Sequence, residues 1–449
     1  MSMSRPNPIQ VLNTYLNDAR AKGLVHLVDE SESHDGHSLK VGGRELVNFG
    51  SCGYMSLAFE PRVKNGGIEA IQKYGIQFST SRAYLSNPLY SELEELLERI
   101  FSLPTLVTPS TTLGHLAALP ILVGPEDVVL MDMQVHSSVQ MAAQLLKASG
   151  VHVELISHSN VARLERKIKA YKDTKKKIWF FADGVYSMYG DIAPVEELAA
   201  LLDVHEQFHL YLDDAHGMSW TGERGRGSVL DRLPRHPRMV VLTSLSKGFG
   251  TGGGAIVCPD AETKRLLSNC GATLTFCGPL QIPVLGAAVE SAKIHLEPGF
   301  AGMQKELADR IAHCTRLLAT QPLPLLSASD SPIQFVGVGN TEKAQDIVQR
   351  MIARGFWLNI AQYPAVGPKH AGLRFMLTRT TPFEHIDRLV EAMRETVREV
   401  IGQDEASIAP IWRSFHKEYG VGSPPPALAV PPLEGAHLAG AGARQMRSQ

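Results

Sequence analysis

The sequence contains few cysteines and none of the close cysteine pairs that mark stapled or metal-bound domains. Its 449 residues include five cysteines, at 52, 258, 270, 277 and 314. An odd number without a C-x-x-C pair argues against a disulfide framework and against a structural zinc site. We therefore expect no bound metal.

Long apolar runs and an excess of charge of one sign are also missing. No stretch reaches the roughly 18 apolar residues of a membrane-spanning helix, and the N-terminus lacks the apolar segment of a signal peptide. The 44 basic and 46 acidic residues leave a net charge of −2, which gives no reason to expect nucleic acid or an anionic membrane as a partner. The composition predicts a globular, cytoplasmic protein.

The middle of the chain alternates short apolar segments with amphipathic ones. This pattern is typical of an α/β fold in which a mostly parallel sheet is covered by helices on both faces. Helices are expected between the strands, for example at 137–149 and 194–208. The expected strands lie at 127–132, 152–157, 177–183, 209–214, 239–244 and 253–258.

The flanking regions suggest a second, smaller domain. A helix is expected near 279–296 and another at 385–401, with strands at 332–339 and 373–378. From about residue 421 the chain is rich in Pro, Ala and Gly, and we expect this part to be flexible. The predicted organisation is an N-terminal helical arm with a small-domain segment (1–50), a large domain (51–295), a small α+β domain (296–402) and a C-terminal extension (403–449).

Three short motifs suggest other chemistry, but each lacks its structural context. HEQFH (205–209) has the spacing of a zinc protease, yet the predicted helix ends near 208 and His209 begins a strand. GFGTGG (248–253) resembles a dinucleotide fingerprint but precedes a strand rather than a helix. SLSK (244–247) lacks the companion K-T-G of the penicillin-binding proteins.

Lys247 follows a predicted strand within a run of small residues, TSLSKGFGTGGG. Small neighbours allow a flat ligand to approach the backbone, and ligands of α/β sheets bind at strand ends. A lysine at such a site can form a Schiff base with an aldehyde cofactor. Asp213 and His216 lie at the end of another strand, where a carboxylate can keep a pyridine ring protonated. Asp214 is an alternative for that role, and either aspartate can instead cap a helix.

Further polar residues follow other predicted strands or begin helices. Thr111 and Thr112 offer hydroxyl and N–H groups at a helix N-terminus, which suits a phosphate as well as it suits an ordinary cap. His136 and Ser187 each follow a strand, and an imidazole there can stack on a ring.

These motifs, in their order along the chain, resemble those of the α-oxoamine synthases. The resemblance covers about residues 45–400 and includes PSTTLGH (109–115), D-x-x-x-H (132–136), DGVYSMYGD (183–191), DDAHG (213–217), GERGRG (222–227) and TSLSKGFG (243–250). It implies a fold-type-I enzyme dependent on pyridoxal 5′-phosphate (PLP), with a mostly parallel seven-stranded sheet and a smaller C-terminal α+β domain. It also implies condensation of an amino acid with an acyl thioester, on coenzyme A or an acyl carrier protein, with loss of CO₂ to give an α-aminoketone.

The resemblance implies catalytic roles for residues that match the family's motifs. Lys247 matches the lysine that holds the cofactor as a Schiff base and later removes the Cα proton. Asp213 matches the partner of the pyridinium nitrogen, and His216 the histidine near the phenolic oxygen. His136 matches the histidine that stacks on the cofactor ring and meets the incoming acyl group.

Binding roles follow in the same way. Thr111, Thr112 and Ser244 match positions that contact the cofactor, with Ser244 at its phosphate, and Ser187 matches the serine beside the phenolic oxygen. Arg374 matches the arginine that binds the substrate carboxylate, a task suited to a bidentate guanidinium. A homodimer with the active site at the interface is also implied.

The chain departs from the family at a few positions. Cys52 stands where the family often has Asn, Tyr90 where it often has His, and Cys277-Gly278 where a Ser-Thr pair reaches the neighbouring subunit's phosphate. These changes leave open which amino acid and which acyl donor the protein uses. A fold-type-I aminotransferase or a retro-aldol enzyme acting on a small amino acid is the alternative, because both would share Lys247 and Asp213.

Overall fold

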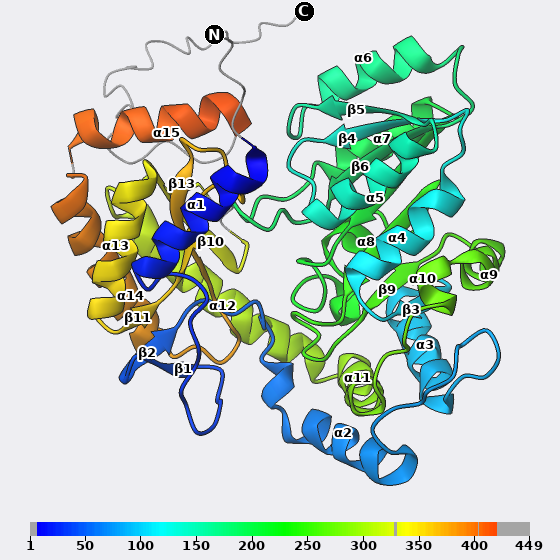
Figure 1. Ribbon diagram of the computed structural model, residues 1–449, viewed down its shortest axis with the longest axis horizontal. Helices are drawn as coiled ribbons and strands as arrows, with labels where there is room; N and C mark the ends of the chain where they lie inside the picture. Colours follow the sequence, from blue (N-terminus) through cyan, green and yellow to red (C-terminus); the bar gives the residue numbers. More distant parts are fainter. Residues whose placement is uncertain (1–6, 327–329, 403, 420–449) are drawn as a thin grey trace, which may run out of the picture.

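The computed structural model describes residues 7–326, 330–402 and 404–419. Figure 1 shows two lobes, with the middle of the chain in one and both ends of the described chain in the other. The C-terminal stretch from about 421, for which we expected flexibility, lies outside the described residues.

The larger lobe is built on a seven-stranded sheet with the order β3-β9-β8-β7-β6-β4-β5. Neighbouring strands from β8 to β5 are parallel, whereas β9 is antiparallel to both β8 and β3. The sheet is therefore mostly parallel, as predicted. Its strands are β3 (Thr105–Thr108), β4 (Val128–Asp132), β5 (His152–Ile156), β6 (Ile178–Asp183), β7 (Phe208–Asp213), β8 (Met239–Ser244) and β9 (Gly254–Val257).

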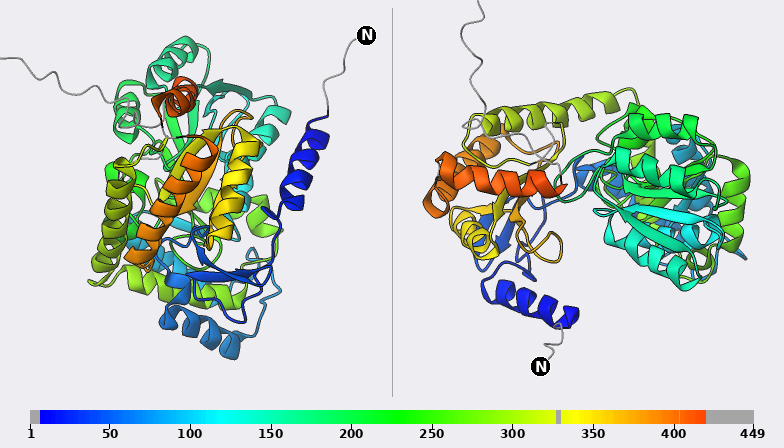
Figure 2. Two further views of the ribbon diagram at one scale, coloured as in Figure 1. Left: turned by 90° about the vertical axis from the view of Figure 1, so that its left-hand side faces the viewer. Right: turned by 90° about the horizontal axis from the view of Figure 1, so that it is seen from above.

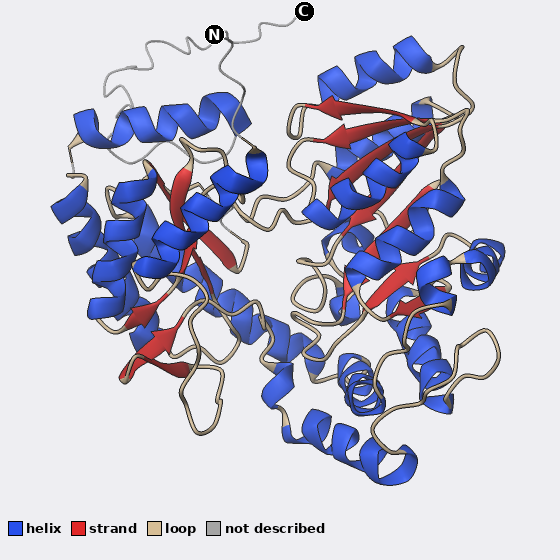
Figure 3. Cartoon of the chain, in the orientation of Figure 1, coloured by secondary structure: helices blue, strands red, loops and turns tan. Residues whose placement is uncertain are grey.

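The strand sequences explain why the sheet is central. Every residue of β4, β6 and β8 is buried, because both faces of the sheet are covered and the strands are apolar up to the polar residues at their carboxyl ends. Figures 2 and 3 show helices on both sides of this sheet. The helices of this lobe are α2 (Pro61–Tyr74), α3 (Pro88–Phe101), α4 (Thr111–Leu122), α5 (Ser137–Ala148), α6 (Val161–Tyr171), α7 (Val195–Val204), α8 (Ser228–Arg232), α9 (Ala261–Cys270), α10 (Ala272–Thr275) and α11 (Ile282–His295).

The smaller lobe contains two short three-stranded sheets. One has the order β10-β13-β12 and is antiparallel, and the other joins the N-terminal β1 and β2 to β11. Its strands are β1 (Ser38–Val41), β2 (Arg44–Asn48), β10 (Ile333–Gly339), β11 (Phe356–Trp357), β12 (Asn359–Ala361) and β13 (Ala371–Met376). Its helices are α1 (Pro8–Ala21), α12 (Phe300–Ala319), α13 (Thr341–Ala353), α14 (Phe383–Val400) and α15 (Glu405–Tyr419).

Helix α15 belongs to the core of the smaller lobe. Phe415 is fully buried, and its ring packs against those of Tyr189 and Phe335 at centroid distances of 5.9 Å. The first part of the predicted C-terminal extension is thus a packed helix. The boundaries predicted for the two domains stay a prediction.

The strands predicted from the apolar segments are all observed. Those of the large sheet and β10 begin and end within one residue of their predicted positions, whereas β13 begins and ends two residues earlier than the predicted 373–378. The helix predicted at 194–208 is too long, because α7 ends at Val204 and the chain turns before β7 begins at Phe208. Strand β3 was not predicted, and it has only four residues. Among the described residues, no helix is both long and apolar enough to cross a membrane.

Candidate active site

Six of the predicted site residues lie at one edge of the large sheet. They lie at or just after the carboxyl ends of β4, β6, β7 and β8, and they are His136, Ser187, Asp213, His216, Ser244 and Lys247. Parallel strands present these ends together, which is where ligands of α/β sheets bind. The grouping is close enough for electrostatic coupling: Asp213 and Lys247 act on His136, and Asp213 acts on Lys247.

Asp213 is a buried carboxylate whose charge is held by a histidine. Its Oδ2 lies 3.0 Å from Nε2 of His115, and its Oδ1 accepts the N–H of Ala215 at 3.0 Å. Burial raises the pKa of Asp213, but the attraction and the hydrogen bond from His115 outweigh it and lower that pKa to about 2. Nδ1 of His115 lies 2.8 Å from the hydroxyl of Tyr211, which fixes the ring from its other side.

No role was predicted for His115, although it closes the PSTTLGH motif. The signal for it was a histidine within the apolar helix LGHLAAL, and its side chain is completely buried. A buried imidazole needs hydrogen-bond partners. Its partners come from β7, almost a hundred residues further along the chain, which the local sequence does not reveal.

Asp214 does a different job from Asp213. Its Oδ2 accepts the N–H of Val229 at 3.0 Å, at the start of α8. Burial raises the pKa of Asp214 to about 7. A Cβ added to Gly217 would lie 2.2 Å from Oδ1 of Asp214, so this carboxyl is enclosed by close-packed backbone. Because its carboxyl accepts an N–H at the start of α8, Asp214 rather than Asp213 is the aspartate that caps a helix.

Lys247 follows a tight turn after β8. The hydroxyl of Ser244 accepts the N–H of Ser246 at 3.1 Å, and the N–H of Gly250 donates to the carbonyl of Lys247 at 2.9 Å. Burial lowers the pKa of Lys247, although Asp213 raises it in part. Ser244, predicted to contact a phosphate, thus also shapes the turn that carries the lysine.

His216 is oriented by a residue from the N-terminal part of the large lobe. The hydroxyl of Tyr54 lies 2.7 Å from Nδ1 of His216, and both side chains are buried. Burial lowers the pKa of His216, and Lys247 and Arg374 lower it further. The ring is therefore neutral at physiological pH. Tyr54 lies in the SCGYMSL segment, but no role was predicted for it.

Arg374 brings the smaller lobe into the site. It lies in β13, and its Nε donates to the carbonyl of Ser187 at 2.7 Å. Its Nη2 lies 3.7 Å from Sγ of Cys52. Cys52, the residue that stands where the family often has Asn, is therefore next to the predicted carboxylate anchor.

The other two departures are linked through Leu280. Tyr90 is buried, and its hydroxyl accepts the N–H of Leu280 at 2.6 Å. Leu280 follows Cys277-Gly278 in the segment between α10 and α11. Tyr90 therefore holds the backbone of the segment that, in the family, reaches the neighbouring subunit.

The start of α4 presents free backbone donors. Ser110 caps the helix by accepting the N–H of Leu113, and Thr111 and Thr112 occupy its first turn. First-turn N–H groups have no intrahelical acceptor, so they are available to an anion. A Cβ on Gly254 would lie 2.9 Å from the nitrogen of Thr111, so only a glycine lets β9 begin this close to the helix.

His136 caps α5 and faces a cavity. The N–H of Ser138 donates to its Nδ1 at 3.3 Å, so the neutral ring carries its proton on Nε2. Burial lowers the pKa of His136, which favours that neutral form. A cavity of about 390 Å³ is lined by His136, Ser187 and the 363–368 loop of the smaller lobe.

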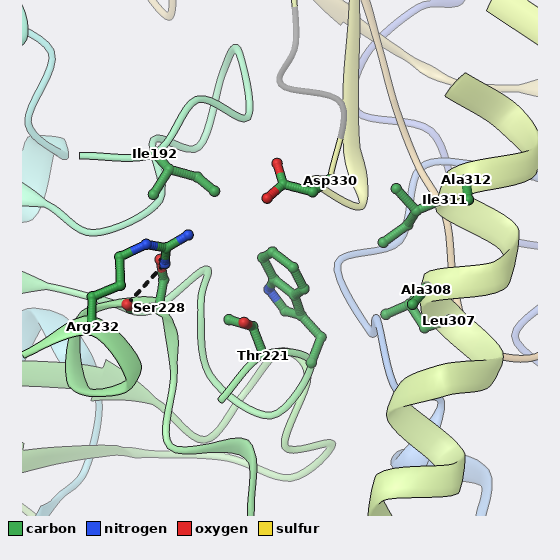
Figure 4. A pocket seen from close by; sticks show the side chains of 10 residues that line it. Ile192, Thr221, Ser228, Arg232, Leu307, Ala308, Ile311, Ala312 and Asp330 are labelled. Carbon is green, nitrogen blue, oxygen red and sulfur yellow. Dashed lines mark hydrogen bonds between the residues drawn. The ribbon is translucent and has the colours of Figure 1, made fainter. Parts of the chain in front are cut away.

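A second cavity, of about 310 Å³, lies between the 220–232 region and α12 (Figure 4). It is lined on one side by Trp220 and Arg232 and on the other by Leu307 and Ile311, and Arg232 is bound to Ser228. None of the predicted site residues lines it. Its link to the site is Trp220, whose indole N–H donates to the carbonyl of His216 at 2.5 Å.

Two of the three misleading motifs are explained by the observed structure. His205 lies in the turn after α7, whereas His209 is in β7 with its ring 4.8 Å from that of Trp179, so the two do not share a helical face. In the described parts of the chain, no group of three His, Cys, Asp or Glu side chains is arranged to hold a metal ion. The GFGTGG segment leads into β9 rather than into a helix.

The residues at the strand edge fit PLP. An amine with a lowered pKa, a carboxylate kept charged by His115 and a helix N-terminus with free N–H groups are the groups that its aldehyde, pyridine nitrogen and phosphate require. Together with the sheet order, they define the class of the protein: a PLP-dependent transferase of fold type I.

Comparison with known proteins agrees with this class. The family model for aminotransferase class I and II matches residues 46–393. The 8-amino-7-oxononanoate synthase of Methylocella silvestris is 33% identical over 360 residues, which cover 80% of this chain and 98% of that protein. The enzyme of the same name from Dechloromonas aromatica is 30% identical, with coverages of 86% and 98%.

The fold is also that of solved α-oxoamine synthases. A serine palmitoyltransferase from S. paucimobilis superposes with a TM-score of 0.80 at 22% identity, over 87% of this chain and 97% of that one. An 8-amino-7-oxononanoate synthase from Francisella tularensis has a TM-score of 0.66 at 20% identity, over 79% and 98%. The chain belongs to the aminotransferase class I and II family and, within it, to the α-oxoamine synthases. It is a PLP-dependent acyltransferase that condenses an amino acid with an acyl thioester and releases CO₂.

Proposed function

We propose that Lys247, Asp213, His136 and Arg374 carry this condensation, and that the aminotransferase and retro-aldol reactions are not the main activity. The observation that carries these residue roles is the electrostatic arrangement at the strand edge, and the preference for condensation rests on the family to which the chain belongs. The half-buried amine of Lys247 shares that edge with the carboxylate of Asp213, whose pKa of about 2 keeps it charged at any physiological pH.

When bound, PLP supplies the electron sink that makes the Cα proton of an amino acid removable. Asp213 maintains that sink by holding a negative charge against the pyridine nitrogen. Lys247 moves the proton at Cα, and burial assists it because a lowered amine pKa provides more of the neutral base. His216, neutral and fixed by Tyr54, donates or accepts at the phenolic oxygen without adding charge.

Arg374 binds the carboxylate of the amino acid. Its Nε is already held by the carbonyl of Ser187, which leaves the two terminal nitrogens for a bidentate contact. Cys52 flanks this contact with a small, weakly polar thiol. We propose an α-amino acid with a single carboxylate as substrate, since Arg374 is the carboxylate anchor assigned here and no second arginine is assigned to an acidic side chain.

The acyl thioester enters beside His136. The cavity there opens between the β4–α5 loop and the 363–368 loop, and Nε2–H of His136 is a donor for an oxygen of the acyl group. Coenzyme A and an acyl carrier protein are both donors within this proposal. A basic segment at 232–238, RLPRHPR, could meet an acidic carrier. It does not favour one, because Arg238 binds the carbonyls of His205, Phe208 and Leu202 at the opposite end of β8 from Lys247.

A homodimer completes the proposed site. Tyr84 and Phe276 are both 88% exposed, and Leu85 beside them is 59% exposed. Ser81 donates to the carbonyl of Thr275, which ties these two exposed loops together. Helix α10 is bonded in turn to α4 through Thr273 and Leu113. Such an exposed apolar patch beside the α4 N-terminus supports a second copy of the chain as its partner. A cytoplasmic location is also part of the proposal.

Light scattering tests the dimer. A chain of 49.0 kDa should give twice that mass at micromolar concentration, and Phe276→Asp should lower the measured mass toward that of one chain. Val204→Asp, at an exposed position at the end of α7, is the matched control and should stay dimeric. A fully active wild-type monomer would contradict the proposal.

The reaction is tested with a carboxyl-labelled amino acid and an acyl thioester. Labelled CO₂ and free thiol should appear in equal amounts, and no keto acid should form. A screen of amino acids by the visible absorbance of the bound cofactor should precede it and identify the substrate. Keto acid without thiol release would identify an aminotransferase instead.

A further inference from the structure

A completely enclosed imidazole lies behind the site and has no part in the proposed chemistry. His158 is in the turn after β5, and its side chain is 1% exposed. Its Nδ1 lies 3.0 Å from Oδ1 of Asp132, and its Nε2 lies 2.7 Å from Oδ2 of Asp191. Both ring nitrogens face carboxylates, which only accept, so both donate and the ring is a cation.

The charge of this ring does not depend on physiological pH. Burial lowers the pKa of His158, but the hydrogen bonds that its ring donates to Asp132 and Asp191 outweigh burial and raise that pKa to about 10. The ring of Tyr186 packs edge-on against it at a centroid distance of 4.5 Å. The three charged groups therefore form a fixed unit of one cation between two anions.

Each carboxylate belongs to a loop that carries a proposed site residue. Asp132 ends β4 and accepts the N–H groups of Gln134 and Ser159, which shapes the turn that leads to His136. Asp191 ends the loop that begins after β6 and contains Ser187. The carbonyl of Asp191 accepts the N–H of Tyr186 at 2.9 Å, which closes this loop on itself.

We propose that His158 is a positioning residue, whose ring holds the loop of His136 and the loop of Ser187 at a fixed separation. The inference rests on the proposed function for the roles of His136 and Ser187. It extends to Arg374, because the carbonyl of Ser187 is the acceptor that holds the guanidinium. One buried ring thus sets the distance between the acyl-binding side and the carboxylate-binding side of the site.

The test must separate positioning from simple stabilisation, because removing the cation leaves two buried carboxylates facing each other. His158→Gln removes the charge and keeps one donor. Leu389→Ala is the matched control, since Leu389 is fully buried in α14 and is not part of the site. The two variants are compared by urea unfolding and assayed under conditions in which both are fully folded.

We expect His158→Gln to lower kcat at least tenfold and to raise KM for the amino acid, whereas Leu389→Ala should keep both within about twofold. The visible circular dichroism of bound PLP should change in His158→Gln and not in Leu389→Ala. This signal needs only the bound cofactor, so it reports on positioning even if the substrates proposed above are wrong. If wild-type enzyme releases no CO₂ and thiol, the proposed reaction fails separately.

Asp191→Asn keeps the inference testable if His158→Gln does not fold. It leaves the cation paired with Asp132 and releases the Ser187 loop alone. We expect a higher KM for the amino acid and a smaller loss of kcat than in His158→Gln. Kinetic constants and circular dichroism that match wild type in folded His158→Gln, or in folded Asp191→Asn when His158→Gln does not fold, would overturn the inference.

Discussion

Replacing His115 with Phe is the sharpest test of how the site holds its negative charge. Phe keeps the ring volume within α4 but removes both the hydrogen bond to Asp213 and the contact with Tyr211. His115 is itself proposed to touch neither substrate nor cofactor. Any effect on the reaction must therefore act through the carboxylate of Asp213.

The size of the effect follows from the pKa of that carboxylate. His115 and its neighbours lower this pKa from 3.8 to about 2, and each pKa unit corresponds to about 1.4 kcal/mol. Because the folded-state pKa is depressed, the stabilisation is present above the unfolded value and is lost as pH falls through about 2. We therefore expect His115→Phe to lower the free energy of unfolding at neutral pH by roughly 2 kcal/mol, within the range for a hydrogen bond to a charged group.

The catalytic consequence has a defined direction. Without His115, burial is opposed only by Lys247 and His136, so the pKa of Asp213 rises. The acidic limb of the kcat/KM profile should move to higher pH, and PLP should bind more weakly. His115→Gln, which restores a donor at a similar position, should recover part of both effects.

Urea unfolding, PLP titration and pH profiles measure these quantities. Tyr211→Phe is the control, because it removes the outer hydrogen bond and leaves the one between His115 and Asp213 in place. The reasoning is refuted if His115→Phe unfolds within 0.5 kcal/mol of wild type, a threshold of about the scatter expected for neutral surface changes, and shows the same acidic limb.

Three further variants test the remaining residues. Lys247→Ala should lose the borohydride-reducible linkage to PLP, as measured by mass spectrometry, and a retained linkage would exclude Lys247 as the attachment site. Asp214→Asn should remove a pH dependence of the free energy of unfolding. The pKa of Asp214 is raised to about 7 in the folded state, so the folded protein still holds a proton that the unfolded chain loses near pH 3.8. The stability of wild type therefore falls as pH rises between these two values, and that of the variant does not. Urea unfolding at pH 5 and pH 8 checks this, and equal pH slopes for the two proteins would contradict it. Arg374→Lys should raise KM for the amino acid at least tenfold, about 1.4 kcal/mol, with a smaller change in kcat, because a lysine cannot make the bidentate contact; unchanged KM would remove Arg374 from the carboxylate site.

The sheet could be predicted because its signal is local. Strands such as 239–244 are buried on both faces, so they read as continuous apolar runs between helical patterns. Strand β3 escaped prediction because its four residues are paired only with the antiparallel β9, some 150 residues away. The end of α7 was misplaced because HEQF continues a helical pattern, although the chain must turn there to begin β7.

The residues of the candidate site also fall into those that the local sequence predicts and those that it does not. Residues at strand ends, such as Lys247 and Asp213, were predictable because the chain alternation itself places them at one edge. His115 and Tyr54 were not, since each acts by a hydrogen bond to a residue about a hundred or more positions away. The residues proposed to touch a ligand can thus be predicted from motifs, whereas those that set their charge and orientation depend on tertiary packing.

We propose that the substrate range of this enzyme is set at the seam between the lobes. Arg374 comes from β13 of the smaller lobe and is held by the carbonyl of Ser187 in the larger one. The anchor for the substrate carboxylate is therefore also a tie between the lobes, so amino-acid binding and lobe geometry change together. Cys52 lies at the same seam, 3.7 Å from the guanidinium. A substitution of Cys52 changes the side chain beside the proposed amino-acid site and leaves the hydrogen bond between His115 and Asp213 in place. The choice of substrate can therefore vary while the PLP chemistry stays the same.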